Sequence, residues 1–459
     1  MKNETFTRTS RMAASADTVF AWHALPGAFE RLTPPWILAR VLQQSGGIRD
    51  GAWVVLRVGR WPTALRWKLE HRDYIEGRQF CNVQLSGPFA EWTHTHRVEP
   101  AGPGASHLTD KIEYRLPVAA LARGLLGGYV KRTLNRLFEY RHELMAHEFS
   151  GRFPQPPRPA MNVLVSGSSG LVGSALIPLL TTRGMVVRRL VRQRGERGGD
   201  DVFWDPQAGH IEREKLEGLD AVIHLAGENI ARGRWSQDQK RKIRESRVEG
   251  TRFLAETLAK LDRRPRTLIC ASATGYYGNR GDELVDEDSS PGTGFLAEVS
   301  QAWEQATEPA RQAGIRVVNV RFGVILSAHG GALRKMLLPF RLGLGGRIGS
   351  GRQYLSWISI EDAIGAIYQA LTGETLSGPV NFVSPEPVTN REFTRTLGKV
   401  LHRPTVFPLP AVAARVVMGE MADELLLAST RVRPKRLLAA GYSFRHPELE
   451  TALRAVLGK

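Results

Sequence analysis

The sequence predicts a two-domain protein: an α+β domain over residues 1–150, then a doubly wound α/β domain over residues 161–459. Three observations predict this division. The 459 residues exceed the size at which one hydrophobic core keeps growing. Residues 151–160, GRFPQPPRPA, contain four prolines and are expected to form a stiff linker. Strand patterns dominate before this linker, whereas strand and helix patterns alternate after it.

The first domain is predicted from short strand-like segments that Gly, Pro and Asp separate, followed by one long amphipathic segment. An antiparallel sheet built from such strands curves around the long helix and leaves room for a ligand between them. The expected strands cover residues 52–58, 65–74, 79–85, 93–98 and 107–114, and the expected helix runs from about residue 121 to residue 149.

The stretch FTRTSRMAASADTVFAWHALPGAFERLTPPW, residues 6–36, resembles the opening of the START-like, helix-grip superfamily, which includes polyketide cyclases and lipid or ubiquinone carriers. The resemblance covers residues 1–150. It implies a hydrophobic cavity and a possible hydrophobic ligand, without naming that ligand. Five tryptophans either line this cavity or are ordinary core aromatics: Trp22, Trp36, Trp61, Trp67 and Trp92.

Two histidines of the first domain have the spacing of a metal-binding pair. His94 and His96 are two residues apart in the strand expected at 93–98, so they lie on one face of it. No third ligand is in register with them along the sequence. We therefore expect core or surface histidines and no metal site.

A glycine-rich turn opens the second domain. Residues 163–165 form a short apolar strand and residues 171–180 continue with helical spacing, so GSSGLVG lies between a strand and a helix. One glycine permits the tight turn, the next lets a pyrophosphate approach the backbone, and the last allows the helix to pack closely. The helix N-terminus then binds the phosphates. The expected cofactor contacts are Gly167, Ser168, Ser169, Gly170, Leu171, Val172 and Gly173, with Leu225, Ala226 and Gly227 at the end of the strand expected at 220–225.

The end of the next strand, at residues 185–191, indicates which dinucleotide binds. A carboxylate there would bind the ribose 2'-hydroxyl of NAD, but the sequence continues with Arg192 and no acid. An arginine at this position pairs with a 2'-phosphate, which favours NADP over NAD. Alternatively, Arg188, Arg189 and Arg192 are a solvated basic strand end.

From residue 161 onward the chain resembles the extended short-chain dehydrogenase/reductase superfamily of sugar-nucleotide epimerases and dehydratases. The resemblance is carried by GSSGLVG, DAVIHLAGENI, SATGYYG, RFGVIL and SWISIEDA. It is closer to a branch of epimerase-like proteins of unassigned substrate, through AGENIARGRW, GYYGNRGDE and RVRPKRLLAAGYSFRHPELETAL. It implies a Rossmann-like parallel sheet, a small-molecule substrate and a small substrate-side part from about residue 390.

The chemistry of this superfamily uses a Tyr-x-x-x-Lys pair together with a Ser or Thr that polarises the substrate oxygen. The hydroxyl is present as Ser272 or, in another register, Thr274. Where the pair should fall the sequence reads GFLAEVSQAWE, with no Tyr or Lys. Tyr277 is the substitute proton donor that we expect, with Arg280 lowering its pKa, unless Tyr277 only packs the loop.

A polar loop follows the expected cofactor contact at Gly227. Glu228, Asn229 and Arg232 offer a carboxylate, an amide and a cation to a substrate. A loop of this composition can equally hold the fold together.

Composition narrows the classes of partner. The net charge of +17 is spread over both domains, with no Lys/Arg block of five and no zinc-finger spacing. We therefore expect anionic small molecules and no nucleic acid. The chain has neither a signal-peptide pattern nor 18 consecutive apolar residues, which predicts a cytoplasmic protein without an integral membrane segment.

Two functions remain open from the sequence. The first is an NADP-dependent oxidoreductase or epimerase that acts on an unknown small substrate. The second is a weakly catalytic or non-catalytic NADP-binding protein whose N-terminal domain binds a hydrophobic ligand. The serine element favours the first, and the missing Tyr/Lys pair favours the second.

Overall fold

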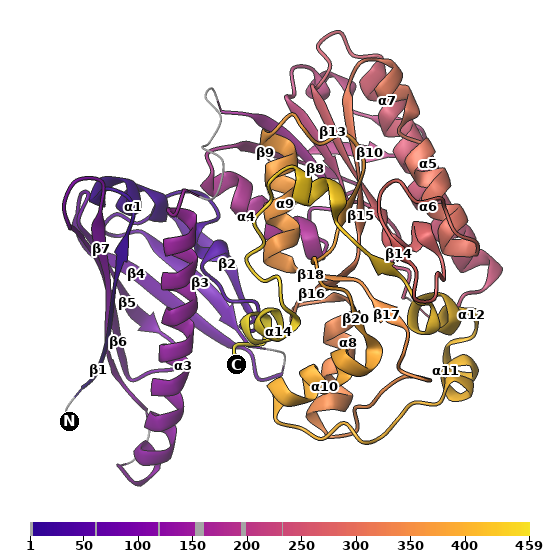
Figure 1. Ribbon diagram of the computed structural model, residues 1–459. Helices are drawn as coiled ribbons and strands as arrows, with labels where there is room; N and C mark the ends of the chain where they lie inside the picture. The colour runs from indigo at the N-terminus through magenta and orange to yellow at the C-terminus, as the bar shows by residue number, and fades with distance from the viewer. Residues whose placement is uncertain (1–2, 60–61, 118–119, 152–159, 194–198, 232) are drawn as a thin grey trace. The chain divides into compact units, whose positions relative to one another are not determined.

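The computed structural model describes residues 3–459 except 60–61, 118–119, 152–159, 194–198 and 232 (Figure 1). The chain divides into two compact units, residues 1–155 with Gly458 and residues 156–457 with Lys459. The predicted proline-rich linker at 151–160 lies almost entirely outside the described residues.

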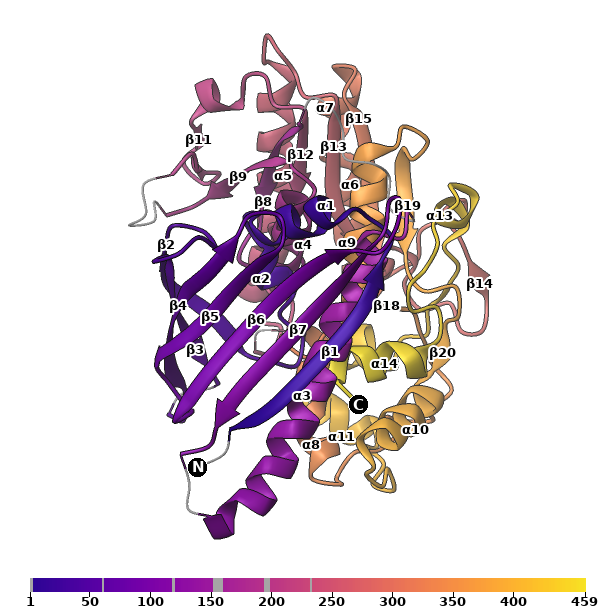
Figure 2. The ribbon, with the colours of Figure 1, turned by 90° about the vertical axis from the view of Figure 1, so that its left-hand side faces the viewer.

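The N-terminal unit is a seven-stranded antiparallel sheet with one long helix, as predicted (Figure 2). The strand order is β1-β7-β6-β5-β4-β3-β2. The five expected strands and the helix are confirmed, whereas β1 and β2 were not predicted. The elements are β1 (Glu4–Met12), α1 (Ala16–His23), α2 (Ala28–Arg31), β2 (Ala39–Ser45), β3 (Trp53–Val58), β4 (Leu65–Ile75), β5 (Gln79–Ser86), β6 (Glu91–Pro100), β7 (Ser106–Arg115) and α3 (Ala120–Glu148).

Side chains of the sheet and of α3 together form the core of this unit. Alternate residues of β7 are buried, among them Leu108 and Ile112, because successive side chains of a strand point to opposite faces. Leu134 and Phe138 of α3 pack against the residues of this face. Trp22 and Trp92 are buried in the core, and Trp36 and Trp67 are half-buried against it. Trp61 lies outside the described residues.

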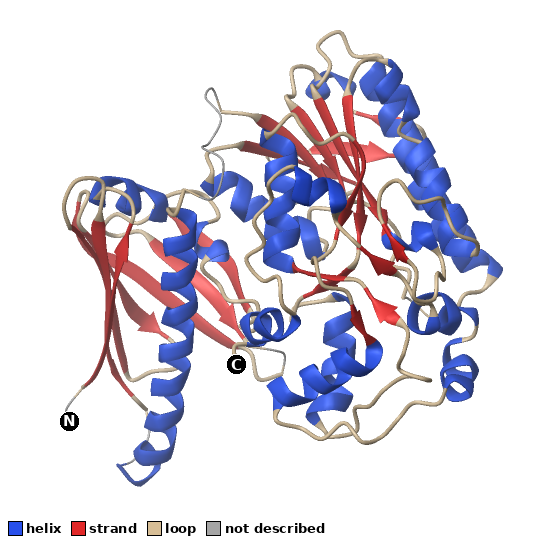
Figure 3. Ribbon diagram, viewed as in Figure 1, coloured by secondary structure: helices blue, strands red, loops and turns tan. Residues whose placement is uncertain are grey.

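The C-terminal unit contains an eight-stranded sheet with helices on both faces, the predicted doubly wound architecture (Figure 3). Its order is β11-β10-β9-β8-β12-β13-β15-β19, and only the β10–β11 pair is antiparallel. The strands are β8 (Asn162–Ser166), β9 (Val186–Val191), β10 (Val202–Asp205), β11 (His210–Ile211), β12 (Ala221–His224), β13 (Thr267–Ala273), β15 (Arg316–Phe322) and β19 (Gly378–Phe382). The helices beside this sheet are α4 (Leu171–Thr182), α5 (Gln237–Ala259), α6 (Phe295–Gln305), α7 (Glu308–Gln312) and α9 (Ile360–Thr372), with the 3-10 turns η1 (Arg213–Leu216) and η2 (Thr274–Tyr277).

The strand order reverses at β8, because β9 and β12 lie on its two sides. Open parallel sheets bind ligands in the crevice beyond the carboxyl ends of the strands at such a switch point. The glycine turn follows β8 directly, so the sequence places it at that edge of the sheet.

Smaller elements follow toward the C-terminus of this unit. Three two-stranded sheets pair β14 with β21, β16 with β18 and β17 with β20. Among the described helices, none is both long and apolar enough to cross a membrane. These elements are β14 (Leu284–Val285), β16 (Val324–Leu326), α8 (Gly331–Arg341), β17 (Tyr354–Leu355), β18 (Trp357–Ser359), β20 (Val388–Thr389), α10 (Asn390–Leu401), α11 (Ala411–Met418), α12 (Glu420–Ala422), η3 (Asp423–Leu427), β21 (Arg431–Val432), α13 (Lys435–Ala439) and α14 (Leu449–Leu457).

Candidate functional site

The turn between β8 and α4 accepts only glycine at two positions. Gly167 has φ of 65°, and a Cβ there would lie 2.7 Å from the carbonyl oxygen of Leu225. A Cβ at Gly173 would lie 2.3 Å from the carbonyl oxygen of Gly167. Both distances are far below van der Waals contact, so the backbone of the turn is packed against α4 and the segment after β12. This is the close approach that the glycine spacing predicted.

The turn presents its backbone to solvent at the start of α4. Ser169 and Gly170 are exposed, while Ser168, Leu171 and Val172 are half-buried. Gly170 is the N-cap of α4 and has no side chain to accept a hydrogen bond from the first turn. The first N–H groups of the helix are therefore available to an anion, which the helix dipole also favours.

The segment after β12 is held against this turn by a buried serine. Ser166 Oγ lies 2.7 Å from His224 Nδ1 and accepts hydrogen bonds from the backbone N–H groups of Leu225, at 3.0 Å, and Ala226, at 3.2 Å. Gly227 follows and is exposed. The residues predicted from two separate motifs thus form one continuous edge.

Arg192 lies at the same edge of the sheet. It follows β9 directly, β9 pairs in parallel with β8, and the Arg192 side chain is exposed. It makes no hydrogen bond or ion pair with the described residues. Arg188, in contrast, donates to the carbonyl oxygen of Lys215 at 3.1 Å. The arginines at this end of the strand therefore differ, because the described residues of the protein bind Arg188 but not Arg192.

The polar loop after Gly227 is partly used by the protein itself. The backbone N–H of Glu228 donates to Ser246 Oγ at 3.0 Å. Burial lowers the pKa of the Arg247 guanidinium to about 10, although the charge of the nearby, half-buried Glu228 partly opposes this shift. Asn229 is exposed, and its Oδ1 accepts from the N–H of Ala231 in a local turn. Arg232 lies outside the described residues.

Ser272 is already engaged by the protein. Its side chain is buried, and its hydroxyl donates to Glu304 Oε1 at 2.7 Å. Glu304 also accepts two hydrogen bonds from Arg321, at 2.7 and 2.8 Å, so the serine supports a buried ion pair. Thr274, the other predicted hydroxyl, is half-buried at the start of η2 and makes no side-chain hydrogen bond with the described residues. Of the two predicted hydroxyl groups, that of Thr274 is available to bind a substrate.

The predicted acidification of Tyr277 by Arg280 is wrong. Tyr277 is fully buried, and burial raises the pKa of its phenol to about 12, although the nearby Arg321 guanidinium partly opposes this shift. The hydroxyl donates to Asn381 Oδ1 at 2.8 Å and accepts from Arg321 at 2.9 Å. Arg280 instead lies 3.4 Å from Glu283 and donates to Ser290. This placement favours the packing role for Tyr277.

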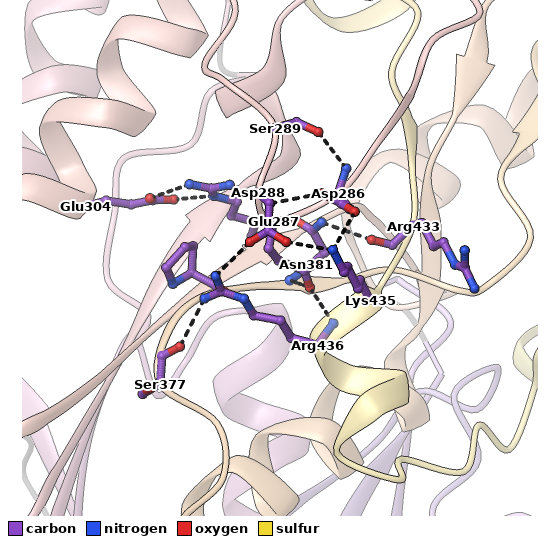
Figure 4. A network of polar contacts seen from close by, with 12 residues as sticks. Asp286, Glu287, Asp288, Ser289, Glu304, Ser377, Asn381, Arg433, Lys435 and Arg436 are labelled. Carbon is purple, nitrogen blue, oxygen red and sulfur yellow. Dashed lines mark hydrogen bonds and ion pairs between the residues drawn. The ribbon is translucent and has the colours of Figure 1, made fainter.

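Asn381 extends this polar cluster toward the C-terminal segment (Figure 4). Its side chain donates to the carbonyl oxygen of Arg433, and its backbone N–H donates to the buried carboxylate of Glu287 at 3.0 Å. Glu287 also accepts from the backbone N–H of Arg436, and burial raises the pKa of Glu287. These hydrogen bonds therefore connect the segment around Arg433 and Arg436 to β19 of the sheet.

Glu304, Arg321 and Asn381 were not predicted from the sequence. Strand register explains why: Ser272 of β13 lies beside Arg321 of β15, which lies beside Asn381 of β19. Together they form a polar row across three parallel strands, and no spacing along the chain reveals it. On α6, where the Tyr/Lys pair was sought, Phe295 stands at the first position and Val299 four residues later.

The sheet order and the glycine turn define an NAD(P)-binding protein of the Rossmann type. Residues 163–381 match a family described as "NAD dependent epimerase/dehydratase family", residues 3–140 match "Polyketide cyclase / dehydrase and lipid transport", and residues 409–456 match "Domain of unknown function (DUF1731)". The chain is 48% identical over 291 residues to epimerase family protein Mb2239 of Mycobacterium bovis, covering 63% of this chain and 96% of that protein. It is 39% identical to human epimerase family protein SDR39U1, covering 65% of this chain and all of that protein. The chain therefore belongs to the NAD-dependent epimerase/dehydratase family.

Two solved structures share this similarity. A nucleoside-diphosphate sugar epimerase from Corynebacterium glutamicum is 34% identical with a TM-score of 0.81, covering 99% of this chain and 90% of that one. Human SDR39U1, solved with NADPH, is 37% identical with a TM-score of 0.61, covering 65% of this chain and 99% of that one. The resemblances that the sequence motifs indicated in both domains are thereby confirmed.

Proposed function

We propose that the C-terminal unit binds NADP and acts as an oxidoreductase or epimerase on a small substrate. The observation that carries this proposal is the exposed glycine turn at the switch point of the sheet, with Arg192 where NAD-selective proteins place an acid. The human relative solved with NADPH supports the same cofactor.

Each part of the edge has a proposed role. Residues 167–173 hold the diphosphate through backbone N–H groups, residues 225–227 border it, and Arg192 pairs with the 2'-phosphate. NADP, when bound, supplies or accepts the hydride. Thr274 donates its hydroxyl hydrogen bond to the substrate oxygen, because Ser272 and Tyr277 are committed to the buried cluster.

The polar loop is the proposed substrate side of the site. Glu228, Asn229 and Arg232 follow the cofactor edge directly and bring groups of both charges and an amide. Such a set suits a substrate with hydroxyl and anionic groups.

A second function is favoured by the burial of Tyr277. If no side chain of the C-terminal unit transfers a proton, this unit only binds NADP. The protein would then act as a non-catalytic or weakly catalytic NADP-binding protein whose N-terminal domain binds a hydrophobic ligand. The family match of residues 3–140 to lipid-transport proteins supports this alternative.

Cofactor selectivity is tested with Arg192→Ala. Loss of a charge-assisted hydrogen bond of roughly 1.5–3 kcal/mol should weaken NADPH binding by about 10- to 150-fold and leave NADH binding unchanged. Arg189→Ala, an exposed arginine of β9, the strand that Arg192 follows, is the matched control. Equal affinity of the wild type for NADPH and NADH would contradict the 2'-phosphate assignment.

Catalysis is tested by transfer of deuterium from labelled NADPH to a panel of carbonyl compounds. The wild type should transfer the label to at least one compound, and Thr274→Val should lower kcat/KM by about tenfold through loss of one hydrogen bond. Tight NADPH binding without any transfer to these compounds would contradict the oxidoreductase activity.

A further inference from the structure

The N-terminal unit contains a buried cluster of imidazole and carboxylate groups that the proposed function does not use. His94 and His96 come from β6 and Asp110 from β7, and all three side chains are more than nine-tenths buried. His96 and Asp110 are directly opposite each other in the antiparallel register. One nitrogen of each histidine and one carboxylate oxygen lie within 4.8 Å of one another. Cross-strand pairing thus provides the third donor that the sequence did not reveal, and it removes the reason for expecting no metal site.

The contact between His96 and Asp110 is close but poorly directed for a hydrogen bond. Nδ1 of His96 lies 2.7 Å from Oδ1 of Asp110, yet this buried nitrogen has no hydrogen-bond partner. The two atoms approach closely without an N–H directed from one to the other. A divalent ion bound by both atoms would satisfy this nitrogen, and the two donors would move apart to the roughly 3.3 Å that a tetrahedral site requires.

The same carboxylate oxygen is shared by the second histidine. Nε2 of His94 lies 2.8 Å from Oδ1 of Asp110. The other oxygen, Oδ2, accepts a hydrogen bond at 2.7 Å from Nε2 of His142 on α3. His142 therefore fixes the orientation of the carboxylate, as the outer partners of metal-binding carboxylates do.

Aromatic neighbours hold the two imidazole rings in place. The His96 ring stacks on Phe80 with centroids 4.2 Å apart and an angle of 15° between the planes. The His94 ring meets the ring of Phe138 edge-on at 5.2 Å. Rings fixed by packing lose little freedom when they bind a ligand.

We propose that His94, His96 and Asp110 form a binding site for one divalent first-row transition-metal ion, with His142 orienting the carboxylate. Two imidazoles and one carboxylate are the donors that Zn²⁺ and Fe²⁺ take in proteins. The ion replaces the proton between His94 and Asp110, so binding releases a proton. Arg141 lies close enough for its charge to act on Asp110, and this positive charge repels a bound cation. The negative charge of Asp110 offsets part of that repulsion.

The test is uptake of Co²⁺ and Zn²⁺ by the full-length chain after treatment with a chelator and dialysis. The wild type should take up one equivalent of Co²⁺ with visible d–d absorption, and Zn²⁺ should displace it. His96→Ala and Asp110→Asn should each weaken binding at least 100-fold with an unchanged circular dichroism spectrum. His107→Ala, an exposed histidine of β7, should bind as the wild type does.

Two results would overturn the proposal. A folded wild-type chain that takes up no Co²⁺ would show that the cluster is a metal-free Asp–His network, and this outcome does not depend on the folding of any variant. Uptake that survives both His96→Ala and Asp110→Asn would place the ion elsewhere. Neither measurement involves NADP, so failure here leaves the proposed function of the C-terminal unit standing.

Discussion

Tyr277→Phe separates a packing role from a catalytic role for this residue. The substitution removes one hydroxyl oxygen and keeps the ring in the cluster formed with Val285, Val383 and Val432. If Tyr277 only supports the fold, the variant loses stability but keeps its affinity for NADPH. If it transfers a proton, the rate of hydride exchange falls by two or more orders of magnitude.

The magnitude follows from the two partners that the hydroxyl leaves behind. Asn381 Oδ1 loses its donor at 2.8 Å, and Arg321 loses an acceptor at 2.9 Å. Arg321 retains both hydrogen bonds to Glu304, so the guanidinium is not left uncompensated. Leaving buried groups unpaired costs about 1–3 kcal/mol, which gives an expected loss of about 2–3 kcal/mol for this pair.

The assay is urea unfolding of the full-length chain, followed by a signal from the C-terminal unit because the two units need not unfold together. The midpoint should fall without a change in slope. Tyr276→Phe is the control: Tyr276 is half-buried, its hydroxyl makes no hydrogen bond with the described residues, and the expected change is below about 0.5 kcal/mol. A Tyr277→Phe variant with wild-type stability and a greatly lowered exchange rate would refute the packing assignment.

Three further predictions concern the same unit. Gly173→Ala should abolish NADPH binding, because its Cβ would lie 2.3 Å from a backbone oxygen. Gly250→Ala is the control and should bind NADPH as the wild type does, because its Cβ would lie 3.7 Å from the nearest atom. Calorimetry measures the affinity of both variants. Glu304→Gln should cost about 3 kcal/mol, because it leaves the Arg321 charge buried without its counter-ion, and urea unfolding measures this loss. Burial lowers the pKa of His224 to about 4 from its usual value near 6.5. The unfolded chain therefore binds a proton that the folded chain does not between about pH 6.5 and 4, and stability is lost as the pH falls through this range. Urea unfolding at several pH values measures how the free energy of unfolding depends on pH. In His224→Asn this dependence should be smaller by up to one proton in this range.

Each of these predictions has a contrary outcome. NADPH binding by Gly173→Ala at wild-type affinity would mean that the cofactor does not use this turn. A stability loss below 1 kcal/mol in Glu304→Gln would show that the ion pair is solvated. A midpoint that depends on pH equally in wild type and His224→Asn would assign the titration to other groups.

Local requirements were visible in the sequence, whereas relations between strands were not. Gly167 and Gly173 could be predicted because a Cβ at either position would collide with nearby backbone, and glycine spacing records this directly. β1 was missed because its burial alternates over a mostly polar sequence that gives little apolar signal. The Ser272 and Arg321 contact, like that of His96 with Asp110, depends on register between strands, which neither composition nor periodicity reports.

Titration calorimetry of the wild-type chain with NADP⁺ and NAD⁺ tests the central claim most directly. A glycine turn that holds the diphosphate, with Arg192 at the 2'-phosphate, predicts one equivalent of NADP⁺ bound and at least tenfold weaker binding of NAD⁺. Absence of heat with either dinucleotide, on protein shown to be folded, would contradict it.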